Sequence, residues 1–396
     1  MAWWEMPLPF VLSPYLRPVR VDGGLAFDNG IAARIEKVDP VAERLVRALW
    51  NPARAEAEVE SLAAEVGVEA VTNAVEQLWN RAMLFDSPEA CEAALDDAWE
   101  AGVPTVPFVD QVELTNACPM RCGFCPRGIP GRMKRATGFL DLALFDRLLG
   151  QMHARQAWYR PLELHHLGES LLHPSIDRFV SLASARGLPT ELSLNPSLLA
   201  PELGARLLDA GVTRLVISLD GVDDDTLVSI RGPAARYGKA ERNLDALLER
   251  VAGMARPPRV VIQMIALTRN AHQREAFLKR WGQSDLPTVT AYLKQLDGPD
   301  PDTRTESERP LVHLCSYPWR SVVVLWDGRV VPCCRDADGE MVLGDLNRQT
   351  LAEVWASDAV RELRRKYLTR EPGAVCTSCA WHRTRYAAEM PRRARL

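Results

Sequence analysis

The sequence predicts an α/β protein built around an open barrel of six parallel β/α units, a partial form of the closed eight-unit barrel. From residue 107 onward, runs that favour a strand alternate with runs that favour a helix, and this alternation predicts a parallel sheet with covering helices. Six units are too few to close an eight-unit barrel. We expect a winged-helix-like domain before the barrel and a β-hairpin/helix domain rich in cysteine after it.

Residues 18 to 86 form the first expected unit. The segments "VRVDGGLAF" and "AARIEKVD" each favour a strand and lie on either side of a turn at "DNG". Two strands and the three amphipathic helices that follow are typical of a winged-helix module. A polar, acidic connection comes next, so this domain and its linker are predicted to span 1–104. The three helical stretches are "PVAERLVRALW", "RAEAEVESLAAEVG" and "VEAVTNAVEQLWNRAML".

The expected barrel occupies residues 105–300. Its strand candidates are "FVDQVELTN", "LELHHLG", "TELSLN", "RLVISLD", "RVVIQMIAL" and "VTAYLKQL". Helical runs between them include "LDLALFDRLLGQMHAR", "PELGARLLDAG", "YGKAERNLDALLERVAG" and "HQREAFLKRWG". The polar, proline-containing segment "DGPDPDTRTESERP" marks the next boundary, which leaves 301–396 for the third domain.

Composition and charge exclude several classes of protein. The chain is 47% apolar and 25% charged, with a formal net charge of −4. These values are ordinary for a well-packed soluble protein and do not favour nucleic-acid binding. No stretch has the apolar length that a membrane span needs, and "MAWWEMPLPF" lacks the features of a secretion signal. We therefore expect a cytoplasmic protein, in which clustered cysteines bind metal rather than form disulfides.

The first cysteine group is "CPMRCGFCP", which contains Cys118, Cys122 and Cys125 and follows the first barrel strand. In parallel β/α folds, active sites gather at the carboxyl ends of the strands. Three thiolates suit three irons of a [4Fe–4S] cluster and leave the fourth iron open for a ligand. The alternative is a structural zinc site completed by a distant histidine, although zinc prefers a closed set of four ligands.

This CxxxCxxC segment resembles the signature of the radical S-adenosylmethionine enzymes, and the resemblance extends over residues 107 to 296. In that family, the open iron binds the amino and carboxylate groups of the methionine portion of S-adenosylmethionine. Reductive cleavage then yields a 5′-deoxyadenosyl radical, which abstracts a hydrogen atom from the substrate. The resemblance implies an external electron donor such as flavodoxin or ferredoxin, and a protein that positions and shields the cofactor.

Further matches imply a set of cofactor-binding residues. "HHLGESLLHP" resembles the Gly-Gly-Glu segment of the family, in which Gly168 allows close backbone approach and Glu169 accepts from the methionine ammonium; Leu167 replaces the first glycine. Asn195, in "LNPS", stands where the family often has an Asn-Gly turn, although Pro196 departs from that pattern.

Two more segments complete the resemblance to the barrel family. Ser218 and Asp220, in "VISLDG", are implied ribose contacts, and Arg231, in "SIRG", is the implied partner of the S-adenosylmethionine carboxylate. Outside this context, a Ser or Asp at a strand end is usually a cap and a glycine is usually a turn. We interpret the histidines at 165, 166 and 173 as packing or hydrogen-bonding groups rather than ligands.

The second cysteine group lies in the third domain. A hairpin, "SVVVLW-DG-RVVPC", is followed by a turn and a short helix in "LGDLNRQTLAEVWAS", and then by "CTSC". Four thiols suit either a zinc ribbon or a second [4Fe–4S] cluster. The segment resembles the auxiliary-cluster domain of the Twitch/SPASM type, in its shorter single-cluster form, which implies a cluster. The implied ligands are Cys315, Cys333, Cys376 and Cys379, and Cys91 and Cys334 are left over.

Two substrate classes fit these features. The N-terminal module resembles the peptide-recognition element of enzymes that modify ribosomally synthesised peptides, related to the small peptide chaperone of pyrroloquinoline quinone synthesis. That element adds a leader peptide as a strand to a sheet edge. The resemblance implies a precursor-peptide substrate in natural-product biosynthesis.

The alternative is a small molecule, because the auxiliary cysteine spacing is also similar to that of radical dehydrogenases of aminocyclitol antibiotic precursors, whose relatives epimerise or decarboxylate sugars. A third hypothesis is an iron–sulfur sensor with a DNA-binding head, but it leaves Glu169 and Arg231 unexplained and the head is not basic. Cys334 is a candidate hydrogen donor to a substrate radical, or else a small core residue beside the cluster.

Overall fold

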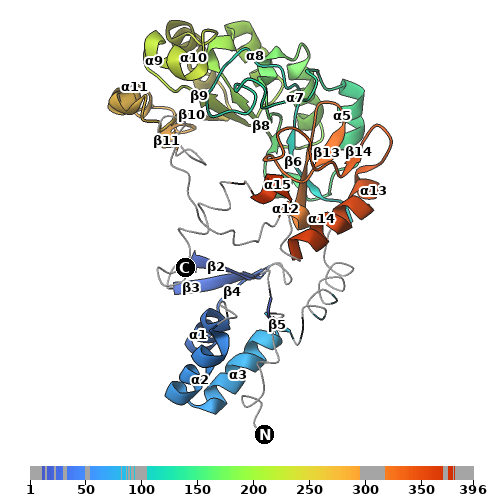
Figure 1. The fold of residues 1–396 in the computed structure, drawn as a ribbon. Helices are drawn as coiled ribbons and strands as arrows, with labels where there is room; N and C mark the ends of the chain where they lie inside the picture. Colours follow the sequence, from blue (N-terminus) through green and yellow to red (C-terminus); the bar gives the residue numbers. More distant parts are fainter. Residues whose placement is uncertain are drawn as a thin grey trace.

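The computed structural model of the chain is shown in Figure 1. It describes three main ranges, 54–81, 105–294 and 317–368, together with a set of shorter pieces. Cys91 and Cys315 lie outside the described residues. The shorter pieces are 11–13, 16–21, 24–29, 34–49, 83–85, 87, 90, 93, 373–377 and 379.

Six parallel strands form the barrel, and each pairs with its neighbour in chain order. This arrangement confirms the predicted open barrel of six parallel strands. The strands are β6 (Phe108–Val112), β7 (Leu162–Glu163), β8 (Thr190–Leu194), β9 (Arg214–Ser218), β10 (Arg259–Ile265) and β11 (Val289–Lys294).

The helices lie on the outer side of this sheet (Figure 1), where they pack on strand residues such as Leu192 and Ile217 in one continuous core. Local capping fixes several starts: Asp141 accepts from the backbone N–H of Leu144 at the start of α5, as expected for an N-cap aspartate. The helices are α5 (Leu142–Leu149), α6 (Gln156–Tyr159), α7 (Ile176–Ser184), α8 (Pro201–Asp209), α9 (Asp224–Arg231), α10 (Tyr237–Ala252) and α11 (Arg274–Trp281), with 3₁₀ turns at Ser170–Leu172, Pro196–Leu198 and Ala271–Gln273.

The second barrel strand is shorter than predicted. The sequence predicts a strand over the whole of "LELHHLG", but β7 ends at Glu163. Beyond Leu164, whose N–H still bonds the Glu191 carbonyl at 2.8 Å, the chain turns towards the cysteine loop, where the N–H of Glu169 bonds the Ala117 carbonyl at 2.8 Å. A segment that must reach this loop cannot continue along the sheet.

The third domain extends the barrel sheet instead of forming a sheet of its own. Strand β12 (Ser321–Val324) pairs in parallel with β6, and the sheet then continues through β13 (Arg329–Val331) and β14 (Gly344–Asp345), giving nine strands in the order β11-β10-β9-β8-β7-β6-β12-β13-β14. The predicted hairpin is present, with Val324 opposite Val330 across the Asp-Gly turn. The helices of this part are α12 (Tyr317–Arg320), α13 (Leu351–Trp355), α14 (Asp358–Leu368) and α15 (Ala374–Thr377).

The larger sheet of the N-terminal unit contains three strands where the sequence predicts two. The segment "VRVDGGLAF" holds the second half of β2 (Leu16–Val21) and the first part of β3 (Gly24–Asn29), because the pairing of Val21 with Gly24 closes a hairpin with a two-residue loop. Strand β4 (Arg34–Glu36) completes an antiparallel sheet in the order β2-β3-β4.

Three helices follow in the N-terminal unit, α1 (Pro40–Leu49), α2 (Ala55–Val66) and α3 (Val68–Trp79). They share a core of their own that includes Leu45, Leu62 and Leu78. The third helix is shorter than predicted, because Leu84 and Phe85 leave it to form β5 (Leu84–Phe85), which pairs with β1 (Val11–Leu12). In the part of the chain that the structure describes, no helix has the length and apolar character to cross a membrane.

Candidate active site

The cysteine loop after β6 is tightly wound. The N–H of Cys125 bonds the carbonyl of Cys122 at 3.1 Å, and the N–H of Gly128 bonds the carbonyl of Cys125 at 2.9 Å. A Cβ atom at Gly128 would lie 2.4 Å from the Cys122 carbonyl oxygen. The tight winding of the loop that carries Cys118, Cys122 and Cys125 therefore needs glycine at this position.

Gly168 closes the other side of this loop. Its φ of +102° is a conformation that favours glycine, and a Cβ atom there would lie 2.3 Å from the Thr115 carbonyl oxygen. Both observations require glycine at position 168, where the sequence predicts that the backbone is closely approached. The same contact brings the next residue, Glu169, against the cysteine loop.

The carboxylate of Glu169 is buried, with 5% of the residue exposed. It accepts from the backbone N–H of Asn195 at 2.9 Å and from that of Leu171 at 3.2 Å. Burial raises the pKa of Glu169 to about 7, against the opposing effect of these hydrogen bonds and of Arg231. A buried carboxylate is stabilised by a positive partner, so this position is suited to an ammonium group.

Arg231, at the end of α9, is held by Asp220. The Nε and Nη2 atoms of the guanidinium lie 2.7 and 2.6 Å from Oδ2 of Asp220. Burial alone would lower the pKa of Arg231, but the carboxylate of Asp220 raises it above its ordinary value. Asp220 also accepts from the N–H of Ile265 at 2.7 Å and is fully buried. Its contacts therefore orient Arg231, and its carboxylate is not exposed to a ligand.

The positive charge of Arg231 lies beside the cysteine loop. The N–H of Arg121 bonds the Arg231 carbonyl at 2.7 Å. Burial raises the pKa of Cys122 to about 11, and Arg231 opposes that rise. The structure thus brings together four of the predicted groups that the sequence places far apart: the cysteines, Glu169, Asp220 and Arg231.

Asn195 and Ser218 complete the predicted set. Asn195 has 2% of its surface exposed, and its Nδ2 atom has no hydrogen-bond partner among the described residues. The hydroxyl of Ser218 accepts from Gln263 at 3.2 Å, and Gln263 in turn accepts from the hydroxyl of Tyr292 at 3.0 Å. The sequence alone did not identify Gln263 or Tyr292. The feature that could have identified them is that each is a polar residue on the inward-facing side of its strand, β10 or β11.

These residues fit an iron–sulfur cluster with an amino-acid ligand. Burial raises the pKa of Cys118 to about 12, so the thiols need a strongly positive partner to become thiolates, and iron supplies one. The loop offers three thiols, while a carboxylate, a guanidinium and an unpaired amide N–H surround it. Ammonium and carboxylate groups of a ligand would meet partners of opposite charge in Glu169 and Arg231.

The second cysteine group is described in part. Cys376 and Cys379 are each 7% exposed, and the N–H of Cys379 bonds the Cys376 carbonyl at 3.1 Å. Cys333 follows β13. Burial raises the pKa of the neighbouring Cys334 to about 11, and Glu163, Asp110 and Cys379 add to that rise. Cys334 therefore lies close to Cys379 and to the barrel strands.

A buried ion pair joins the cysteine loop to the hairpin domain. Two nitrogens of Arg135 donate to the two oxygens of Glu113 at 2.7 and 2.8 Å, and its Nε donates to the Ala337 carbonyl at 2.9 Å. Asp338 accepts from the backbone N–H groups of Lys134 and Arg135 at 2.7 and 2.9 Å. The segment that continues from the cysteine loop is thus fixed against the auxiliary hairpin.

Comparison with family models gives two matches. Residues 112–280 match the Radical SAM superfamily, and residues 315–380 match SPASM, an iron–sulfur cluster-binding domain. The two matched segments contain both cysteine groups.

Known proteins with related sequences include an enzyme named for a small-molecule substrate and enzymes named for a peptide substrate. The chain is 22% identical over 274 residues to the S-adenosyl-L-methionine-dependent 2-deoxy-scyllo-inosamine dehydrogenase of Niallia circulans, covering 68% of this chain and 91% of that protein. It is 26% identical over 191 residues to the PqqA peptide cyclase of Bradyrhizobium diazoefficiens, covering 48% of this chain and 40% of that protein. SuiB of Streptococcus suis, solved with bound S-adenosylmethionine, has a similar fold over 94% of both chains, with 13% identity and a TM-score of 0.51.

Proposed function

Because the chain belongs to the radical S-adenosylmethionine superfamily and carries a SPASM iron–sulfur domain, we propose that it abstracts a hydrogen atom from a ribosomally synthesised precursor peptide and so modifies that peptide in natural-product biosynthesis. The chain uses S-adenosylmethionine and a [4Fe–4S] cluster in each of these two domains. The observation that carries the peptide assignment is the N-terminal unit, a small antiparallel sheet followed by three helices.

The cluster and S-adenosylmethionine supply one-electron chemistry when they are bound, and the chain's own residues hold and orient them. Cys118, Cys122 and Cys125 provide the thiolates. Glu169 accepts the ammonium of the methionine portion, and Arg231 receives its carboxylate in an orientation that Asp220 fixes.

The rest of the S-adenosylmethionine site provides room and hydrogen bonds. Gly168 leaves space for the ligand by keeping its own backbone against Thr115. The unpaired amide N–H of Asn195 and the hydroxyl of Ser218 serve the remaining polar groups.

The auxiliary site belongs to the second cysteine group. We assign its cluster to Cys315, Cys333, Cys376 and Cys379, and we place Cys334 next to the substrate as a candidate hydrogen donor. The packing of Cys334 supports its assignment as a hydrogen donor. Cys334 packs against Val323, Leu325 and Val331, which lie on the face of the sheet opposite the helices of the barrel.

The N-terminal sheet is suited to capturing a peptide. Strands β2 and β4 are its two edges, and an extended peptide can add to such an edge through backbone hydrogen bonds. SuiB bound to its precursor peptide SuiA has a similar fold over 90% of both chains, with a TM-score of 0.50, and PqqA peptide cyclases are among the related sequences. Both support a peptide substrate for this chain.

The test is leader-peptide binding. A fluorescent leader peptide encoded beside the gene should bind the full chain saturably in an anisotropy titration, and deletion of residues 18–86 should abolish the binding. A chain without this unit that retains full activity on a free aminocyclitol would refute the peptide assignment.

A second candidate is oxidation of a small aminocyclitol. The observation in its favour is the alignment with the 2-deoxy-scyllo-inosamine dehydrogenase, which covers 91% of that protein and leaves this chain's N-terminal unit as an addition. Product analysis by mass spectrometry separates the two candidates: loss of two hydrogens from 2-deoxy-scyllo-inosamine supports the second, whereas a mass change in the precursor peptide supports the first.

A further inference from the structure

Part of the inner face of the partial barrel is polar. Side chains alternate between the two faces of a strand. On β8, Leu192 and Leu194 lie in the core beneath the helices, so Glu191 and Ser193 face inward. On β9 the corresponding inward residues include Arg214 and Ser218. The interior of a closed barrel of this type is usually filled with branched apolar side chains, so this interior has a different role.

Four of these inward residues lie at the same height. Strand register pairs Gln111 with Glu163, Glu163 with Glu191, and Glu191 with Arg214 across β6 to β9. His165 follows the end of β7, and its side chain lies beside Glu163 and Glu191. We call Gln111, Glu163, His165, Glu191 and Arg214 the polar layer.

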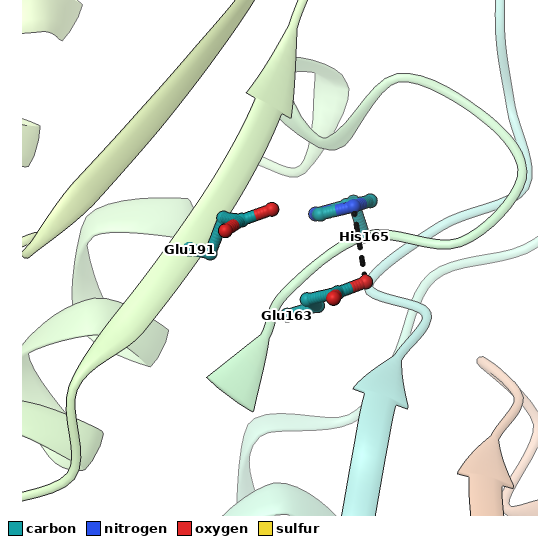
Figure 2. A group of neighbouring side chains, drawn as sticks. All are labelled: Glu163, His165 and Glu191. Carbon is teal, nitrogen blue, oxygen red and sulfur yellow. Dashed lines mark ion pairs between the residues drawn. The ribbon is translucent and has the colours of Figure 1, made fainter. Parts of the chain in front are cut away.

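The members of the polar layer contact one another. Gln111 donates to Glu163 at 2.5 Å, and Arg214 lies 2.9 Å from the carboxylate of Glu191. Figure 2 shows Glu163 at the end of β7, His165 just after it and Glu191 on β8, with one ligand atom from each within 4.8 Å of the others. The Nε2 atom of His165 lies 3.5 Å from Glu163. The three side chains enclose a common point.

The polar layer does not suit a metal ion. The backbone N–H of Ser193 donates to Nδ1 of His165 at 3.2 Å, so in the neutral imidazole the hydrogen is on Nε2, the atom nearest Glu163. A metal at Nε2 would need the opposite tautomer. Each carboxylate already has a guanidinium partner, Arg160 for Glu163 and Arg214 for Glu191. Arg160 also lies 3.8 Å from the buried carboxylate of Asp110, so its charge is shared between two carboxylates.

Two buried atoms beside the trio lack partners. Nδ1 of His166 bonds Oε1 of Gln111 at 2.9 Å, which leaves Nε2 of His166 as an acceptor. Within the ranges that the structure describes, neither this atom nor Nε of Arg214 has a hydrogen-bond partner. Buried polar atoms in native proteins are nearly always paired, and leaving them unpaired is costly. The acceptor Nε2 of His166 and the donor Nε of Arg214 are therefore available to a polar ligand.

The polar layer also lies between the two cysteine groups. On one side, Asn195 follows β8 and donates its backbone N–H to Glu169 in the S-adenosylmethionine site. On the other side is Cys334, which packs against Val323, Leu325 and Val331. The polar layer therefore shares β8 with the S-adenosylmethionine site and belongs to the same sheet as β12 and β13, against which Cys334 packs.

We propose that the polar layer binds a hydroxyl group of the substrate. A hydroxyl both donates, to the carboxylate of Glu163 or Glu191, and accepts, from the imidazole N–H of His165. It is neutral, so it can bind without adding charge to the layer, whereas a carboxylate would place a further negative charge beside Glu163 and Glu191. The inference rests on the proposed function only in placing the substrate inside the barrel.

Matched probes test this proposal with the full-length holoenzyme and S-adenosylmethionine under anaerobic conditions. Ligand-observed saturation-transfer NMR compares N-acetyl-serinamide with N-acetyl-2-aminobutyramide, which has a methyl group in place of the hydroxyl; scyllo-inositol is the small-ring probe. A hydroxyl probe should bind about tenfold more tightly than the methyl probe, the effect of one hydrogen bond to a charged group. Glu191→Gln and His165→Leu should remove this preference, and Glu202→Gln, an exposed position on α8, should keep it.

Each outcome separates this inference from the proposed function. Preference for N-acetyl-serinamide supports both, and binding of scyllo-inositol alone supports the polar layer while it contradicts a peptide substrate. Equal binding of the serine and methyl probes without scyllo-inositol binding overturns the inference, as does tight uptake of one Zn²⁺ that both layer variants abolish. If a variant fails to fold by circular dichroism, the wild-type probe comparison decides. Leader-peptide binding is measured independently of all of these.

Discussion

Breaking the ion pair between Arg135 and Glu113 should destabilise the connection between the cysteine loop and the auxiliary hairpin. The two side chains are 2% and 0% exposed, and their contact is bidentate. Replacing Arg135 with methionine leaves the carboxylate of Glu113 buried with only the backbone N–H of Trp326, 3.2 Å away, as a neighbouring donor. An unpaired buried charge of this kind costs about 3–5 kcal/mol of unfolding free energy.

The double variant makes the prediction specific. Replacing a buried pair with apolar side chains of similar volume is often close to neutral, so Glu113→Leu combined with Arg135→Met removes the charge penalty. What remains is the loss of the hydrogen bonds to Ala337 and Trp326, about 1 kcal/mol each. We therefore expect the double variant to lose about 2 kcal/mol, which is less than either single variant loses.

The assay is urea unfolding of the purified chain, monitored by hydrogen exchange at residues 321–331, because a chain with several units does not unfold in one step. Arg44→Met is the matched control: it removes an arginine from a pair with Glu65 whose side chains are 44% and 62% exposed, and such a change should leave stability unchanged. If Arg135→Met is no more destabilising than Arg44→Met, or if the double variant loses as much as the two single variants together, the reasoning is refuted.

Three further predictions concern the two sites. Replacing the three cysteines of the loop after β6 with alanine should reduce iron from about eight to about four atoms per chain and abolish S-adenosylmethionine cleavage; retained cleavage would remove the site assignment. Gly168→Ala should weaken S-adenosylmethionine binding at least tenfold in equilibrium dialysis, because the new Cβ would lie 2.3 Å from the Thr115 carbonyl oxygen, whereas Gly187→Ala, with a similar φ of +69° and nothing within 4 Å, should not. Cys334→Ala should preserve cluster content and 5′-deoxyadenosine formation but abolish product if this thiol donates a hydrogen atom, and unchanged product formation would assign Cys334 to packing.

The barrel could be predicted because its signal is local. Each strand candidate carries its own run of β-branched and aliphatic residues, and each is separated from the next by a helical run, so the order of the strands follows from the order of the segments. The cysteine loop, Glu169 and Arg231 could be predicted for a related reason: each follows a strand or helix at a recognisable place. The N-terminal hairpin was missed because residues on both sides of "DGG" favour strands, so two strands resemble a single one.

The polar layer could not be predicted, because it depends on register between strands. Gln111, Glu191 and Arg214 are far apart in the sequence, and each is an unremarkable polar residue in its own segment. A shift of one residue in the pairing of β8 would place Leu192 inward and Glu191 beneath the helices. Only the register of Glu163 with Glu191, and of Glu191 with Arg214, puts these side chains at one height. His165, which the sequence alone favours as a packing or hydrogen-bonding residue, follows β7 directly and so lies beside Glu163 among these charged groups.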